Sequence, residues 1–174
     1  GVVTASVTDT AANLVKGLTD AKATDKLTLT VSAGTATAAE LKALDAKTSV
    51  AVDAKLVTEI TGNAADVKTV LKADGITLDK VTTGAVAVEV TGTVSAADAN
   101  TIAKATDGKV TATVAAGTAA SLKAALTDVT ATDALKLKVT GTATVADLLA
   151  LDGKTSIPVD AKSVTAITGT AAEF

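Results

Sequence analysis

Apolar and polar residues alternate along five short segments of the chain, and each segment is rich in β-branched residues. The segments are residues 3–7, 27–31, 86–90, 110–114 and 135–139. A period of two predicts strands with one buried face. Between these segments the apolar residues recur three or four positions apart, which is the spacing of a helix with one apolar face. The pattern therefore predicts short strands alternating with short helices.

A five-residue phrase marks the start of each predicted helix. It consists of Thr, Ser or Asn, two small apolar residues, a polar or acidic residue, and usually a larger apolar residue. The phrase occurs seven times, beginning at Thr10, Thr37, Asn63, Ser95, Thr118, Thr144 and Thr170. Its first side chain can accept a hydrogen bond from the free N–H groups of a first helical turn.

Five of the seven phrases carry an acid three positions after the cap, namely Glu40, Asp66, Asp98, Asp147 and Glu173. Such an acid can reach back to the N–H of the capping residue and form a capping box. It also lies favourably at the positive end of the helix dipole. We therefore assign these acids to helix capping.

Glycine and proline predict the turns. Six glycines precede the helix starts and should let the chain turn sharply from strand to cap: Gly34, Gly62, Gly92, Gly117, Gly141 and Gly169. Three others follow an Asp and are predicted to end helices in a left-handed conformation: Gly75, Gly108 and Gly153. The only proline, Pro158, is expected at an edge, turn or bulge. Residues 49–62 and 156–169 are each long enough for two extended pieces joined by a turn.

A longer repeat overlies the short one. Residues 35–62 align without a gap with residues 142–169 at an offset of 107, with 20 identities in 28 positions. The phrase at Thr10 maps to that at Thr118 at an offset of 108. We interpret residues 1–174 as one solenoid segment with about one and two-thirds copies of a 107–108-residue block, an excerpt of a longer array. The interval of 32 residues between Asn63 and Ser95 is the longest between phrases and leaves room for an inserted strand or loop.

The predicted fold class is α/β, a right-handed repeat solenoid with a parallel sheet on one side and short capped helices on the other. Right-handedness follows from the strong preference of β-helix-β crossovers. The alternative is a mostly-β solenoid in which the capped segments are single turns. Circular dichroism distinguishes the two, because only the first has substantial helical signal.

Composition excludes several kinds of chemistry. The chain is 48% hydrophobic but only 1% aromatic, which suits a thin, regular core better than an aromatic-lined pocket. Cys and His are absent, and with them the ordinary zinc site, the thiol nucleophile and the Ser-His catalytic system. Net charge −3 and the lack of Arg argue against nucleic-acid binding. The longest uncharged apolar stretch, residues 110–122, is shorter than the roughly 20 residues of a membrane span.

Four aspartates raise a calcium hypothesis. Asp20 and Asp25 recur as Asp128 and Asp133 in the segments between helix and strand. Calcium takes about six to eight oxygen ligands, so two carboxylates per segment are few. Turn and cap roles account for most of the aspartates. We therefore assign no catalytic, cofactor-binding or metal-ligating residue, and calcium stays an alternative.

Threonine pairs on the predicted strands raise a second alternative, a binding face for ice or carbohydrate. The outward pairs are Thr28 with Thr30, Thr111 with Thr113, and Thr4 with Ser6. The corresponding positions elsewhere are Ala87 with Glu89 and Lys136 with Lys138, which interrupt the ranks. A solvated sheet face with high strand propensity explains the threonines equally.

Residues 44–67 (LDAKTSVAVDAKLVTEITGNAADV) and 151–174 (LDGKTSIPVDAKSVTAITGTAAEF) carry a resemblance. They resemble the repeat region of giant cell-surface proteins of marine cyanobacteria, of the swimming-associated or surface-layer-like kind. Through the internal repeats this likeness covers nearly the whole chain. It implies a secreted, surface-attached structural or adhesive polypeptide and supplies no catalytic residues.

We therefore expect a non-enzymatic structural segment of an extracellular cell-surface protein, a spacer in a fibre, surface layer or adhesin. Its expected partners are neighbouring repeats of the same chain, with self-assembly or a cell-surface polysaccharide as further candidates. No cofactor is expected. The competing hypothesis is a binding module that uses the outward threonine face or calcium.

Overall fold

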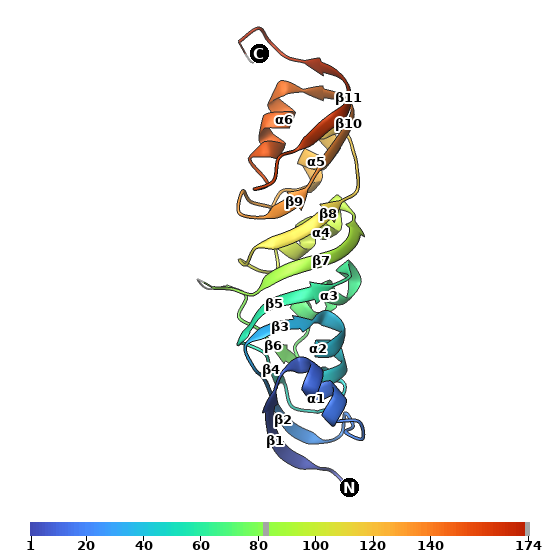
Figure 1. Ribbon diagram of the computed structural model, residues 1–174, viewed down its shortest axis with the longest axis vertical. Coiled ribbons are helices and arrows are strands. Elements are labelled where there is room, and N and C mark those ends of the chain that lie inside the picture. Colours follow the sequence, from blue (N-terminus) through green and yellow to red (C-terminus); the bar gives the residue numbers. More distant parts are fainter. Residues whose placement is uncertain (82–83, 173–174) are drawn as a thin grey trace. The chain divides into compact units, whose positions relative to one another are not determined.

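The computed structural model describes residues 1–81 and 84–172. These residues form an α/β fold with parallel sheets and six helices (Figure 1). The chain divides into two compact units: residues 1–89 with 105–108, and residues 90–104 with the chain from Lys109 onward. β7 (Ala87–Val94) carries the chain from the first unit into the second.

The first unit contains three helices and six complete strands. In chain order they are β1 (Thr4–Asp9), α1 (Ala11–Gly17), β2 (Lys26–Val31), β3 (Gly34–Thr37), α2 (Ala38–Asp45), β4 (Val52–Asp53), β5 (Val57–Gly62), α3 (Ala64–Lys72) and β6 (Ile76–Thr77). Four strands form one parallel sheet in the order β1-β2-β4-β6, whereas β3 pairs in parallel with β5. Helices and sheets enclose a core of aliphatic side chains that includes Leu29, Leu41, Leu44 and Ile60, all 0% exposed.

The second unit repeats part of this arrangement. Its elements are α4 (Ala96–Ala103), β8 (Val110–Val114), α5 (Ala119–Ala125), β9 (Ala134–Lys136), β10 (Lys138–Thr144), α6 (Val145–Asp152) and β11 (Asp160–Thr168). β8 pairs in parallel with β9, and β10 pairs in parallel with β11. The core again consists of fully buried aliphatic residues, among them Ile102, Leu126, Leu135 and Leu151.

Where two strands lie between consecutive helices, as β2 and β3 do, the two belong to different sheets, whereas the sequence predicted one sheet on one side. Gly34 shows why in the first unit. It has φ 130°, a conformation that favours glycine, and it turns the chain between β2 and β3. β2 therefore joins the sheet with β1 and β4, and β3 pairs with β5.

Most predicted strands are confirmed with small shifts in their ends. β1, β2, β7 and β8 cover the expected segments, and residues 49–62 form two strands, β4 and β5. Two expectations are wrong. Residues 135–139 are interrupted at Leu137, which separates β9 from β10, and residues 156–169 contain one strand, β11. Pro158 lies just before β11 and outside it, where its missing N–H is not needed by a ladder.

Six of the seven phrases are confirmed as helix starts. At each, the capping side chain accepts a hydrogen bond from the N–H three residues later, as at Asn63 (2.9 Å from Asp66 N) and Thr10 (3.3 Å from Asn13 N). The other four caps are Thr37, Ser95, Thr118 and Thr144. The seventh phrase begins at Thr170, and its last two residues, Glu173 and Phe174, lie outside the described residues.

The acids after the caps do not all act as predicted. Glu40 forms a complete capping box, because its Oε2 accepts the N–H of Thr37 at 2.9 Å. Asp66 and Asp98 bond to the side chains of their caps instead, at 2.7 Å from Asn63 Nδ2 and 3.0 Å from Ser95 Oγ. Asp has one methylene fewer than Glu, which explains its shorter reach.

The predicted left-handed helix ends at Gly75, Gly108 and Gly153 are wrong, because none of these glycines has a positive φ. Gly153 is helical, with φ −68°. Gly108 is needed for space, because a Cβ there would overlap the main-chain oxygen of Val86. A Cβ at Gly75 would meet the Asp45 carboxylate, which would have to shift. Of the glycines before helix starts, Gly34, Gly92 and Gly141 do have positive φ.

Candidate functional site

Five buried polar side chains lie where one repeat meets the next. They are Asp25, Thr48, Thr106, Asp133 and Thr155, each 4–6% exposed. Each bonds to main-chain groups 20 to 23 residues away in sequence, one repeat earlier. In the described part of the chain, no buried side-chain nitrogen or oxygen lacks a hydrogen-bond partner. These residues join consecutive repeats and form the inter-repeat contacts.

Asp25 and Asp133 make the same two-sided contact in the two units. Asp25 Oδ1 accepts the N–H of Val3 at 2.8 Å, and its Oδ2 accepts the N–H of Lys22 at 2.9 Å. Asp133 Oδ1 accepts the N–H of Val110 at 2.8 Å, and its Oδ2 accepts the N–H of Thr130 at 2.9 Å. One oxygen thus closes a local turn while the other holds the strand start of the preceding repeat. The main-chain donors at Val3 and Lys22 also lower the pKa of Asp25.

Thr48 and Thr155 provide a hydroxyl that serves as both donor and acceptor. Thr48 Oγ1 accepts the N–H of Leu27 at 3.0 Å and donates to the Leu27 carbonyl at 2.7 Å. Thr155 does the same with Leu135, at 3.0 and 2.8 Å. Each hydroxyl therefore satisfies both polar main-chain groups of a buried strand residue, which would otherwise carry a desolvation penalty.

Thr106 makes a related contact in a repeat that lies outside the aligned copies. Its Oγ1 donates to the Val86 carbonyl at 2.9 Å and accepts the N–H of Gly108 at 3.0 Å. The close approach of Gly108 to the Val86 oxygen belongs to the same contact. Threonine, and the glycine two residues later, together let this loop pack against the preceding strand.

Ion pairs join consecutive helices at matched positions within each unit. Lys42 on α2 pairs with Asp66 on α3, and Lys123 on α5 pairs with Asp147 on α6, with N–O 2.7 Å in the second pair. In both cases the lysine is the fifth residue after its cap and the acid is the third residue after the next cap. The lysine is the largest cause of the lowered pKa of each of these aspartates. Surface pairs of this kind contribute little to stability.

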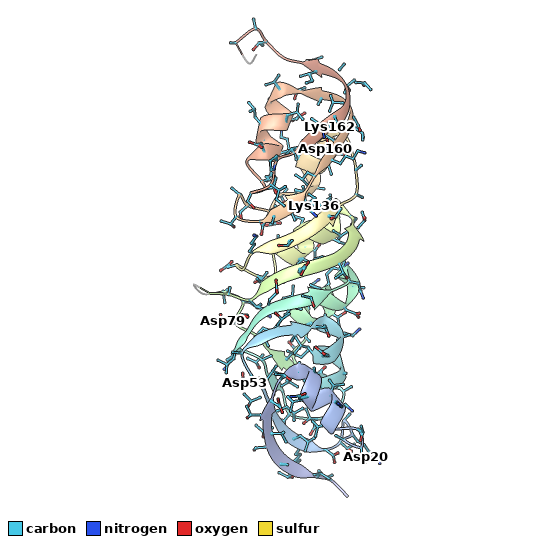
Figure 2. All side chains as sticks on the ribbon, in the orientation of Figure 1. Asp20, Asp53, Asp79, Lys136, Asp160 and Lys162 are labelled. Atoms are coloured by element: carbon cyan, nitrogen blue, oxygen red, sulfur yellow. The ribbon has the colours of Figure 1, made fainter. Side chains whose placement is uncertain are left out.

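The four aspartates of the calcium hypothesis differ in their hydrogen-bond partners. Asp25 and Asp133 use their oxygens for main-chain N–H groups. Asp128 Oδ2 accepts from Asn100 Nδ2 at 2.8 Å, which is the main cause of its lowered pKa. Asp20 is exposed in the loop after α1 (Figure 2). Over residues 1–81 and 84–172, no group of three or more acidic side chains could hold a metal ion.

On the predicted binding face, rows of neighbouring Thr and Ser side chains extend over few strands. In the β1–β2 pair, Ser6 lies beside Thr28 and Thr8 beside Thr30. The next neighbour of Thr30 is Asp53, labelled in Figure 2, which ends the rank. In the second unit Thr113 lies beside Lys136. Lys138 begins β10, so it does not share a strand with Lys136, as the sequence had predicted.

A groove of the second unit has a volume of about 500 Å³. Its lining includes Thr113, Lys136, Pro158 and Asp160. Lys136 and Asp160 are labelled in Figure 2. It is open and without the aromatic side chains that line most small-molecule sites. The groove therefore offers charge and hydroxyl groups but no stacking surface.

The threonines of the inter-repeat contacts were not predicted from sequence as functional residues. A signal for two of them was present, because Lys47-Thr48-Ser49 recurs unchanged as Lys154-Thr155-Ser156. The serines take part in the same contacts, since Ser49 Oγ and Ser156 Oγ donate to the carbonyls of Asp25 and Asp133, each at 2.9 Å. A fully exposed loop would not need the same polar residues in both copies, so their recurrence indicates a buried contact.

Comparison of the chain with protein-family models, with curated proteins and with solved structures found no match. No helix in the described ranges is long and apolar enough to cross a membrane. A functional conclusion therefore has to come from the chain's own residues, and above all from the inter-repeat contacts.

Proposed function

We propose that this chain is a non-enzymatic structural segment of an extracellular cell-surface protein. In this proposal its repeats stack as a right-handed α/β solenoid and act as a spacer in a fibre, surface layer or adhesin. The observation that carries the proposal is the recurrence of the inter-repeat contacts, Asp25 as Asp133 and Thr48 as Thr155, at equivalent places. Contacts that recur from repeat to repeat let a chain grow by adding units, each held only by its neighbours.

The polar residues support a structural role. The buried aspartates and threonines bind main-chain groups of the preceding repeat, and the acids after the helix caps bind caps or neighbouring lysines. These side-chain groups thus hold the repeats and their helix caps in place. The resemblance to repeats of giant cyanobacterial surface proteins supports an extracellular location for the chain.

The surface location can be tested on cells that produce the protein. Antibodies raised against the purified chain should label intact cells, and protease added outside the cells should remove the label. A cytosolic protein detected only after permeabilisation is the control. Labelling that also requires permeabilisation would contradict the proposed location.

A further inference from the structure

The end of the second unit exposes apolar side chains whose counterparts in the first unit are buried. Ile167 is 48% exposed, whereas Ile60, its counterpart at the offset of 107, is 0% exposed. Four further identical residues are half-buried in the second unit but at most 2% exposed in the first: Leu148, Val159, Ala161 and Val164, against Leu41, Val52, Ala54 and Val57. Because the residues are identical, the difference comes from what covers them.

In the first unit the cover is the next repeat, formed by α3 and β6. β6 pairs in parallel with β4, with Val52 beside Ile76. Two main-chain bonds of 2.8 Å complete this edge, from Val52 N to the Gly75 carbonyl and from Ala54 N to the Thr77 carbonyl. α3 contacts both α2 and β5, and its apolar face of Val67, Val70 and Leu71 is buried.

The corresponding surface of the second unit is open. β11 is the edge strand of a two-stranded sheet. Beside it lies a cavity of about 290 Å³, lined by Leu148, Leu149, Asp152, Pro158, Val159 and Ala161. Leu149 takes the position of Lys42 and is 64% exposed, so this end is more apolar than the equivalent part of the first unit.

We propose that this end face, defined by Leu148, Val159, Ala161, Val164 and Ile167, is the docking surface for a further repeat with the chemistry of residues 63–78. That chemistry is a capped helix with an apolar face, followed by a Gly-Ile strand start. The repeat is supplied in cis, because in the first unit the covering helix begins directly after β5, at the Asn63 cap. The inference rests on the proposed stacking of repeats.

The charge pattern distinguishes this contact from those between α2 and α3 and between α5 and α6. At the two observed helix pairs a lysine meets the acid of the next helix. At α6 the incoming helix instead meets Leu149, so its binding depends on apolar contact rather than on an ion pair. Added salt should therefore leave this docking unchanged.

An extended variant tests the proposal. Residues 68–86 are repeated directly after Phe174, which continues the chain in the register of the first block. The matched control carries the same extension with Val70→Asp and Leu71→Asp in the added copy. Hydrogen exchange is measured for the amides of β11 and, as a check of folding, for those of β9.

In the extended variant, exchange in β11 should slow by about tenfold or more, at low and at high salt, with β9 unchanged. The control extension should leave β11 at the rate of the unextended chain. Equal rates in extended and control proteins would overturn the proposal. Protection of β11 in the unextended chain that rises with protein concentration would also overturn it, because a second copy would then cover the face. The outcome of the cell-labelling test does not depend on these results. The docking proposal can therefore fail while the proposed function stands.

Discussion

At the scale of single residues, the inter-repeat contacts depend on polar side chains with little freedom to be replaced. Thr48 Oγ1 serves the N–H and the carbonyl of Leu27 together, and Asp25 holds two N–H groups at once. A hydroxyl is the smallest group that both donates and accepts, and a carboxylate is a short side chain with two acceptors. These contacts therefore join main chain to main chain between repeats.

Thr48→Val tests the hydroxyl contact. Valine keeps the shape of threonine but leaves the buried N–H and carbonyl of Leu27 unpaired, so the free energy of unfolding should fall by about 1–3 kcal/mol. Thr58→Val, at an exposed position of β5, is the control and should change it by less than about 0.5 kcal/mol. Denaturant unfolding followed by circular dichroism measures both variants. Equal effects of the two substitutions would rule out the special role of Thr48.

The Asp25 contact predicts a dependence on pH. Hydrogen bonds from the N–H groups of Val3 and Lys22 hold the pKa of Asp25 below its ordinary value of 3.8. The unfolded chain therefore takes up the proton first as pH falls, so the stabilisation is complete above the ordinary pKa and is lost through the lowered one. Stability measured from pH 7 to pH 2 should decline in acid.

Asp25→Asn should lower the free energy of unfolding at neutral pH. It should also make the loss of stability between pH 7 and pH 2 smaller. Asp20→Asn, in the exposed loop after α1, is the matched control. An acid decline as steep in Asp25→Asn as in Asp20→Asn would show that the Asp25 contact does not contribute to it.

At the scale of elements, the helices are too short to be stable alone. They have seven to nine residues, and isolated helices below about 12–15 residues are marginal in water. Caps and packing against the sheets must therefore hold them. The repeated cap phrase fixes where each helix begins, and the buried leucines and valines fix which face turns inward.

Close packing between elements makes Gly108→Ala a sharp test. The added Cβ would overlap the main-chain oxygen of Val86, which cannot rotate away, so we expect a loss of about 1–3 kcal/mol. Gly17→Ala is the control, because no atom lies within 4 Å of the Cβ position at the end of α1. Thermal unfolding should separate the variants, with Gly17→Ala at or above the parent. A Gly108→Ala variant as stable as Gly17→Ala would contradict this packing.

Local elements could be predicted from sequence, whereas contacts between distant segments could not. Caps such as Thr37 and strands such as 110–114 depend on neighbouring residues, and both are confirmed. The role of Thr48 depends on Leu27, 21 residues away, and only the recurrence of Thr48 as Thr155 hinted at it. The break at Leu137 and the required Gly108 also depend on tertiary neighbours, which no local pattern encodes.

At the scale of the whole molecule, we propose that the repeats continue one stack through recurring contacts. Asp25 and Asp133 lie in different units and make the same bonds, so this contact between repeats recurs. A stack in which each repeat contacts only its neighbours can be extended by adding further repeats. The exposed Ile167, against the buried Ile60, fits a surface that is made to be covered by another repeat.

Small-angle X-ray scattering of the monomeric chain tests this claim most directly. A compact globule of 174 residues has a radius of gyration of about 16 Å, and an unfolded chain of that length about 44 Å. The stacked solenoid predicts a value clearly between the two, with a distance distribution that peaks early and falls along a long linear tail. A radius near 16 Å with a symmetric distribution would contradict the solenoid.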